Sequence, residues 1–220
     1  MKYRSVFDII GPVMVGPSSS HTAGAVRIGR LARALFGRSP KLVRLRFFGS
    51  FAKTFRGHAT DVAALAGVLG IEVDDPRIAD AVAIARSMGI EVEYIAEDAV
   101  PAHPNTLTAE LSDESGSMSA TGVSLGGGLV QMTEVDGFSL RLSGDSPALL
   151  IFHRDAYGTI ASITRLLAEG CININHMEVS RADRGQTALM VIETDERVAA
   201  DVIERMNRQN NIYKIITLDV

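Results

Sequence analysis

Residues 16–24 of the chain read GPSSSHTAG and combine two glycines, a proline, four hydroxyl side chains and one imidazole. Apolar residues follow at the spacing of one helix face, at Ala25, Ile28, Leu31, Ala32 and Leu35. This spacing predicts a helix over residues 20–36, with Gly37 as its stop signal. The polar run therefore belongs to the loop and first turn that enter a helix. The unpaired N–H groups and the positive dipole end found there suit an anion such as a carboxylate.

The side chains of this run supply hydrogen-bond donors and a group that titrates near neutral pH. His21 is the titrating group, and the donors are Ser18, Ser19, Ser20 and Thr22. One serine could simply be the N-cap of the helix, since serine is a preferred cap. A cap needs a single serine, however, and does not account for His21 or Thr22. A hydrolase-type nucleophile is a weak alternative, because the run lacks the G-x-S-x-G elbow and a serine and a histidine on one turn rarely meet in attack geometry.

A second dense polar run, GSFAKTFRGHATD at residues 49–61, follows a predicted strand. Lys53 and Arg56 in this run could pair with an anion. His58 lies four residues before Val62, on the same face of the helix that is expected to resume there. A histidine at such a position is normally a packed or capping residue, so a structural and a functional role both stay open for His58.

A third polar stretch, PAHPNT at residues 101–106, places His103 between two prolines. The prolines make the backbone stiff and non-helical. This stretch is either a plain loop or a third wall of the same pocket, with His103 and Asn105 as candidate substrate-binding residues. The three glycines at 126–128 do not form a phosphate loop, because no Lys-Ser/Thr follows them and the next residues are strand-like.

The composition of the chain is that of an ordinary globular protein, with 46% hydrophobic and 22% charged residues among 220. A net charge of -4 offers no basic field for nucleic acid. No apolar run approaches the roughly 20 residues of a membrane span, and charged residues at positions 2, 4 and 8 interrupt any secretory segment. The single cysteine, Cys171, rules out an intrachain disulfide and a metal cluster held by this chain's own thiolates. These features predict a cytoplasmic protein that binds neither nucleic acid nor membrane.

The hydrophobic pattern of the first part of the chain predicts mixed α/β structure. A short helix or strand is expected over residues 3–10, ended by Gly11-Pro12. Helices are expected at 20–36, from about Val62 to Leu69, and from Pro76 to Gly89. Strands are expected at 41–48, 90–95, 106–111, 117–123 and 129–134.

The last third of the chain has a clearer pattern, which begins after a predicted linker at residues 143–147. Strands and helices alternate in the order βαββαβ, a ferredoxin-like unit. Strands are expected at 148–153, 172–180, 187–193 and 212–218, and helices at 159–169 and 196–207. Helices on one face of such a sheet leave the other face or an edge strand free to associate. We therefore predict an α+β chain with domains at residues 1–143 and 148–220.

The motifs of both parts resemble known families. The C-terminal unit resembles an ACT domain, whose signature turn is matched by DAYGTI at residues 155–160, followed by ITRLL at 163–167. The three polar runs together resemble the beta chain of the bacterial iron–sulfur-dependent L-serine dehydratase. The first domain is also similar to the allosteric substrate-binding domain of some phosphoglycerate dehydrogenases, which can bind without catalysing.

The dehydratase resemblance implies deamination of L-serine to pyruvate and ammonia by α,β-elimination, a reaction of amino-acid catabolism that can feed gluconeogenesis. It also implies a [4Fe–4S] cluster with one open iron that acts as a Lewis acid. Because Cys171 stands alone, this chain cannot hold the cluster. The cluster is then expected on a partner alpha chain, in a heteromer whose beta chain is inactive alone. ACT domains usually pair through their sheets and bind small amino acids, which implies homodimerisation and effector binding near Asp155 and Gly158.

The resemblance also suggests roles for the polar side chains. The substrate carboxylate is expected on the hydroxyls of the first run, with Lys53 and Arg56 as further anion partners. The base that removes the Cα proton is His21 or His58, and His21 is favoured. His153 and His176 are read as structural or effector-side residues, and no metal ligand is assigned. The alternative is a non-catalytic serine-sensing module like that of phosphoglycerate dehydrogenases. Which histidine is the base, whether the ACT unit binds an effector, the oligomeric state and the preference for serine over threonine stay open.

Overall fold

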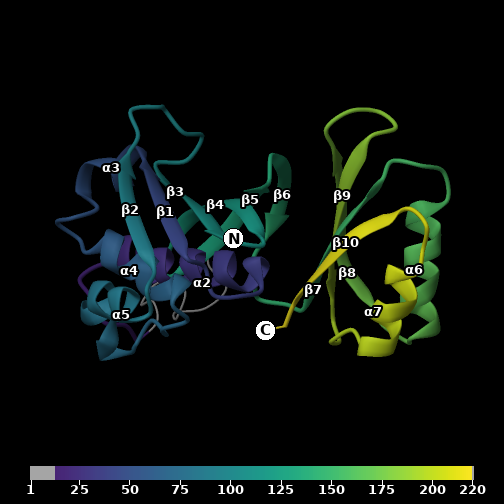
Figure 1. The fold of residues 1–220 in the computed structure, drawn as a ribbon, viewed down its shortest axis with the longest axis horizontal. Coiled ribbons are helices and arrows are strands. Elements are labelled where there is room, and N and C mark those ends of the chain that lie inside the picture. The colour runs from purple at the N-terminus through teal and green to yellow at the C-terminus, as the bar shows by residue number, and fades with distance from the viewer. Residues whose placement is uncertain (1–12, 220) are drawn as a thin grey trace. The chain divides into compact units, whose positions relative to one another are not determined.

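The computed structural model describes residues 13–219, which fall into two compact units (Figure 1). The first unit ends at Asp136 and the second begins at Gly137. The short element expected over residues 3–10 and its end at Gly11-Pro12 lie outside the described residues. The α+β class is confirmed. The domain limits 1–143 and 148–220 stay a prediction.

The first unit is built on a mixed sheet whose strands lie in the order β2-β1-β3-β4-β5. β1 and β2 are parallel, while β1–β3, β3–β4 and β4–β5 are antiparallel. The bounds are β1 (Leu42–Phe48), β2 (Glu91–Ala96), β3 (Asn105–Asp113), β4 (Gly116–Gly126) and β5 (Leu129–Val135). All five strands expected from the sequence are therefore confirmed.

Helices pack against this sheet (Figure 1). The main ones are α2 (Gly24–Phe36), α4 (Thr60–Val68) and α5 (Ala81–Ser87), and the shorter ones are the π-helical turn η1 (Ser19–Ala23), α3 (Gly49–Thr54) and the 3-10 turn η2 (Pro76–Asp80). The helix α3 was not expected from the sequence. α2 and α4 touch through their backbones, because a Cβ added at Gly29 would lie 2.2 Å from the Ala64 carbonyl oxygen.

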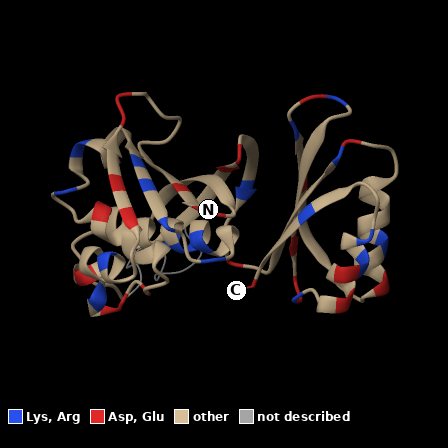
Figure 2. Ribbon diagram, in the orientation of Figure 1, with Lys and Arg blue, Asp and Glu red and all other residues tan. Residues whose placement is uncertain are grey.

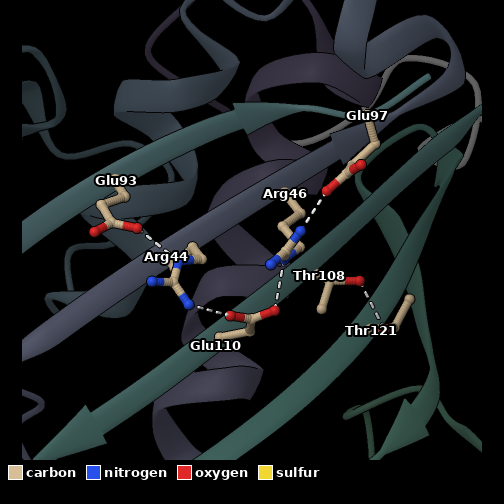
Figure 3. Close-up of polar contacts among 7 residues, drawn as sticks. All are labelled: Arg44, Arg46, Glu93, Glu97, Thr108, Glu110 and Thr121. Carbon is tan, nitrogen blue, oxygen red and sulfur yellow. Dashed lines mark hydrogen bonds and ion pairs between the residues drawn. The ribbon is translucent and has the colours of Figure 1, made fainter. Parts of the chain in front are cut away.

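The strand β1 shows how the sequence assigns the two faces of the sheet. Val43, Leu45 and Phe47 are fully buried, while Arg44 and Arg46 alternate with them and point to the opposite face. There the Arg44 and Arg46 guanidiniums share the Glu110 carboxylate, at 3.0 and 2.6 Å (Figure 3). The same face carries the Arg44–Glu93 and Arg46–Glu97 pairs and a hydrogen bond between the Thr108 and Thr121 hydroxyls.

The second unit contains the βαββαβ order predicted from the sequence. Its antiparallel sheet has the order β10-β7-β9-β8. The elements are β6 (Phe138–Leu142), β7 (Ala148–Arg154), α6 (Thr159–Glu169), β8 (Ile174–Arg181), β9 (Thr187–Thr194), α7 (Ala200–Asn207) and β10 (Ile212–Leu218). Leu149, Ile151, Ile163, Leu167 and Met190 belong to one buried core.

Two details of the second unit differ from expectation. β6 was not predicted. The last helix begins at Ala200 rather than at residue 196, because the Thr194 hydroxyl donates to the Glu196 carbonyl at 2.7 Å and Ala199 keeps an extended backbone. Cations and anions are interspersed on the elements of both units (Figure 2). Within residues 13–219, no helix is long and apolar enough to cross a bilayer.

Candidate functional site

The polar run at residues 16–24 enters α2 through a π-helical turn rather than directly. Ser18 has an extended backbone, and its hydroxyl accepts a hydrogen bond from the His21 N–H at 3.1 Å. The Ser18 carbonyl accepts from the N–H groups of Thr22 and Ala23. Ser18 is therefore a true N-cap. Capping does not explain the rest of the run, and π-turns inside helices are frequent at functional sites.

The His21 imidazole is held at both ring nitrogens by hydroxyls. Its Nδ1 lies 3.0 Å from the Ser20 Oγ and 3.4 Å from the Ser18 Oγ. Its Nε2 lies 3.2 Å from the Oγ of Ser50, in the first turn of α3. A hydroxyl can donate or accept, so this arrangement accommodates either neutral tautomer of the ring.

His58 brings the second polar run to the first. The His21 and His58 ring centroids are 4.9 Å apart, and the Thr22 hydroxyl donates to the His58 carbonyl at 3.3 Å. The expected placement of His58 on a helix face is wrong: α4 begins only at Thr60, and His58 lies in the preceding turn. The reason is Ala59, whose left-handed backbone (φ 54°) separates the turn from the helix.

The electrostatics of the pair favour a neutral His21. Burial is the larger cause that lowers the pKa of His21, and the Coulombic effect of the neighbouring His58 ring lowers it further. A neutral imidazole keeps a lone pair and can accept a proton at neutral pH.

The loop at residues 101–106 adjoins the same cluster. The Ser50 N–H donates to the Pro104 carbonyl at 2.7 Å, and Gly49 forms an isolated bridge with Asn105. The Asn105 N–H in turn donates to the His103 Nδ1 at 3.2 Å. Of the two interpretations of this loop, the geometry favours a third wall over a plain loop.

Three candidate residues take no part in the hydrogen bonds described around His21 and His58. Lys53 is exposed and lines a pocket of about 320 Å³ together with Gly49, Ala52 and residues 96–101, away from the His21 imidazole's hydrogen-bond partners. Arg56 is exposed, and its guanidinium lies over the Phe55 ring, 5.5 Å from the centroid. Within residues 13–219, the Ser19 side chain has no hydrogen-bond partner.

Two residues that the sequence did not single out lie at this site. One is Ser50, described above. The other is Ser124, whose fully buried Oγ has no hydrogen-bond partner in the described part of the chain. A Cβ at Gly24 would lie 2.1 Å from this oxygen, so Ser124 packs against the start of α2. The His58 Nδ1 is buried without a partner as well. Unpaired buried polar atoms are costly, so they suggest sites for a bound polar molecule or water.

Nothing in the described residues forms a metal site, since no group of three or more His, Cys, Asp or Glu side chains converges there. The one cysteine of the chain, Cys171, is exposed in the second unit. An iron–sulfur cluster is held by several thiolates, so the residues of this chain do not fit one.

The expected effector residues lie at the start of α6. Asp155 lines a surface pocket of about 650 Å³, and its carboxylate accepts from the Gly185 N–H at 2.9 Å and from Arg181 at 3.2 Å. The Gly185 hydrogen bond, and then Arg181, hold the Asp155 pKa below its usual range. Gly158 precedes α6 with φ 82° and is not among the lining residues.

The remaining two histidines lie in the second unit, as expected. His153 is buried, and its Nδ1 donates to the Arg154 carbonyl at 2.8 Å. His176 lies on β8, and its Nε2 has no partner in the described part of the chain. Their structural or effector-side role stays a prediction.

Comparison with known proteins agrees with this architecture. The family described as ACT domain matches residues 148–211, so the second unit belongs to the ACT class. The family described as serine dehydratase beta chain matches residues 5–94. Because a relative named as such a beta chain is also 54% identical over 98% of this chain, the chain belongs to the family of L-serine dehydratase beta chains.

The relatives support this assignment along the whole chain. A probable L-serine dehydratase beta chain of Bacillus subtilis is 54% identical, over 98% of both chains. The L-serine dehydratase beta chain of Peptoniphilus asaccharolyticus is 31% identical, over 87% of each. D-3-phosphoglycerate dehydrogenase of Bacillus subtilis is 22% identical over 89% of this chain and 37% of its own length. The resemblance inferred from the three polar runs is therefore confirmed, and the dehydrogenase similarity is distant.

Proposed function

We propose that this chain is the beta subunit of an enzyme that converts L-serine to pyruvate and ammonia. The family membership and the 54% identity over the full chain support the reaction. The structural observation that carries the proposal is His21, a half-buried imidazole with a lowered pKa that lies among hydroxyls from two separate elements.

The reaction needs a base and a means of holding the substrate. A base removes the Cα proton, the C–H electron pair forms the Cα=Cβ bond, and the β C–O bond breaks. The hydroxide that leaves takes up a proton and becomes water. The resulting enamine becomes an imine, and water hydrolyses the imine to pyruvate and ammonia. His21 is suited to the first step because its neutral ring can accept a proton near pH 7.

The polar groups around His21 would bind the substrate. The buried His58 Nδ1 has no partner within residues 13–219, so we propose it, together with the Ser19 hydroxyl, as a contact for a small polar ligand. The positive dipole end of the turn before α2 suits the substrate carboxylate. Thr22, His103 and Asn105 would complete the walls. Lys53 and Arg56 lie apart and would act only as more distant anion partners.

The leaving group requires chemistry that this chain does not provide. Hydroxide leaves poorly, and the proposed remedy is a [4Fe–4S] cluster acting as a Lewis acid. Because the residues here do not fit a cluster, we place it on a partner alpha chain and expect this chain to be inactive alone.

The first experiment is to mix this chain anaerobically with its proposed alpha partner, reconstitute the cluster and measure pyruvate from L-serine. Each chain alone is the control. We expect pyruvate in the mixture only. Pyruvate from this chain alone would contradict the division of labour. If the mixture is inactive but this chain alone binds serine saturably, the result would contradict the proposed dehydratase function and support a serine-sensing module.

That sensing module is the second candidate function, and the phosphoglycerate dehydrogenase similarity favours it.

In either case we propose that the ACT unit pairs with a second copy through its sheet. We also propose that a small amino acid binds near Asp155, in the pocket at the start of α6.

A further inference from the structure

Ser50 connects all three polar runs of the sequence. Its Oγ lies 3.2 Å from the His21 Nε2. Its N–H donates to the Pro104 carbonyl at 2.7 Å, and its own carbonyl accepts from the Thr54 hydroxyl at 2.8 Å. Ser50 is therefore held at its backbone on both sides, and only its hydroxyl remains to meet the imidazole.

The residue before Ser50 explains why the backbone can take this course. Gly49 has φ 57°, a left-handed conformation that favours glycine. A Cβ at Gly49 would lie 2.7 Å from the Pro104 carbonyl oxygen. The turn from β1 into α3 therefore presses directly against the loop at 101–106, and it delivers the Ser50 hydroxyl at a fixed position.

The other hydroxyls on His21 do not provide the same constraint. Ser18 and Ser20 belong to the same turn as His21, so their contacts move with it. Ser50 lies 29 positions away in the sequence and on a different element. Phe51, the next residue, is fully buried, and its ring meets the His21 ring at its edge, with centroids 5.1 Å apart. The ring of His21 is thereby fixed relative to the sheet.

We infer that Ser50 is a positioning residue for His21, which orients the imidazole and sets the partner of its Nε2. The inference rests on the proposed function, in which His21 is the base. A neutral imidazole has one N–H and one lone pair. With both nitrogens on rotatable hydroxyls, the ring can accept a proton at one nitrogen without leaving the other unpaired.

Loss of the Ser50 hydroxyl should change the pKa of His21 in one defined direction. In the protonated ring the Nε2–H donates to Ser50, and a hydrogen bond from a charged donor is stronger than one from the neutral ring. Removing Ser50's oxygen destabilises the charged form more than the neutral form. The pKa of His21 should therefore fall further below its usual range.

The test uses the complete chain, labelled with ¹⁵N-histidine, and follows the ring nitrogens by NMR against pH. The His21 signals are assigned by their loss in His21→Gln. We expect Ser50→Ala to lower the His21 pKa and change its tautomer balance. Ser50→Thr keeps the hydroxyl and should restore the wild-type titration. Ser87→Ala removes a hydroxyl on α5 that donates to the Ile84 carbonyl and touches neither His21 nor the contacts of Ser50, and it should leave the titration unchanged. An unchanged His21 titration in Ser50→Ala would overturn the inference.

Turnover gives a second, separable measurement. In the reconstituted complex, Ser50→Ala should lower kcat by about ten- to a hundredfold, the scale expected from misplacing a reacting group. KM should change little, and the acid limb should move to lower pH. Normal turnover in Ser50→Ala overturns the inference. If even the wild-type mixture makes no pyruvate, the proposed function fails, and the NMR titration still decides whether Ser50 holds the ring.

Discussion

His58 influences the protonation of His21. Their ring centroids are 4.9 Å apart, and two positive charges at that separation repel. Burial is the larger cause that lowers the pKa of His21, and the neighbouring His58 adds to it. His21 is therefore the ring that more readily stays neutral and can act as a base.

Replacing each histidine separately should identify the base. In the reconstituted complex we expect His21→Ala to lower kcat by about 10² to 10⁴-fold, the typical contribution of a general base. His58→Ala should cost less. Assembly, followed by size-exclusion chromatography, and iron content should stay unchanged in both. A larger loss in His58→Ala would transfer the role of base to His58.

The pH dependence of activity tests the same two histidines, because the direction in which its acid limb is displaced depends on the pKa of His21. A base must be unprotonated, so activity falls as the pH drops through its pKa. Because burial and then His58 lower the pKa of His21, the acid limb of kcat/KM should lie below the ordinary histidine value of about 6.5. His58→Gln removes the neighbouring charge and should move this limb to higher pH. A limb that moves down, or stays, would show that His58 does not act on the base.

At the scale of elements, the contact between α2 and α4 fixes the helix that carries the site. Besides the contact at Gly29, a Cβ at Gly67 would lie 2.0 Å from the Val26 carbonyl oxygen. Both clashes are with backbone, which cannot rotate out of the way. The two helices can approach this closely only because glycines occupy both positions.

We expect Gly29→Ala to lower the free energy of unfolding by about 1–3 kcal/mol, the usual cost of overpacking. Urea unfolding of the complete chain measures this. Gly57→Ala is the matched control, because its Cβ would meet the Thr54 carbonyl oxygen at an ordinary 3.7 Å. Equal stability of Gly29→Ala and the wild type would show that the helices separate without cost.

Sequence patterns were informative wherever an element is long and periodic. The strands β1 and β8 alternate between less and more exposed residues, β7 and β9 are continuous apolar runs, α2 has one apolar face, and each was predicted. The helix α3 was missed because its six residues are mostly small or polar and lie within a polar run. β6 was missed because it has only five residues before the predicted linker.

At the candidate site, too, the sequence revealed residues that stand in unusual local runs, and it did not reveal residues whose contacts are distant in the sequence. His21, His58 and the loop at 101–106 were found as unusual local runs. Ser50 and Ser124 were not singled out, because their importance comes from partners far away in the sequence. Ser124 meets Gly24 across about a hundred positions, through the pairing of strands and the packing of α2. No local spacing encodes such a contact.

On the scale of the whole molecule, each unit has its own candidate site. The half-buried histidines belong to the first unit, while Asp155 lines a pocket of the second. Each unit can therefore be probed by a substitution that leaves the other unit's residues in place.

Calorimetry of the complete chain with small amino acids should separate these two sites. We expect Asp155→Ala to weaken binding to the ACT unit by about ten- to a hundredfold, since a hydrogen-bonded charged group contributes roughly 1.5–3 kcal/mol. His21→Ala should leave this binding unchanged. If Asp155→Ala binds as tightly as the wild type, the effector site lies elsewhere.

Cys171 offers a practical consequence. It is the single thiol of the chain, it is exposed, and it lies just after α6 in a left-handed conformation (φ 56°). A maleimide dye would therefore attach at one defined surface position without prior mutagenesis. Cys171→Gly, which suits that backbone, provides a label-free counterpart. Cys171 thus offers a native attachment point for a fluorescent dye that reports association with a partner in real time.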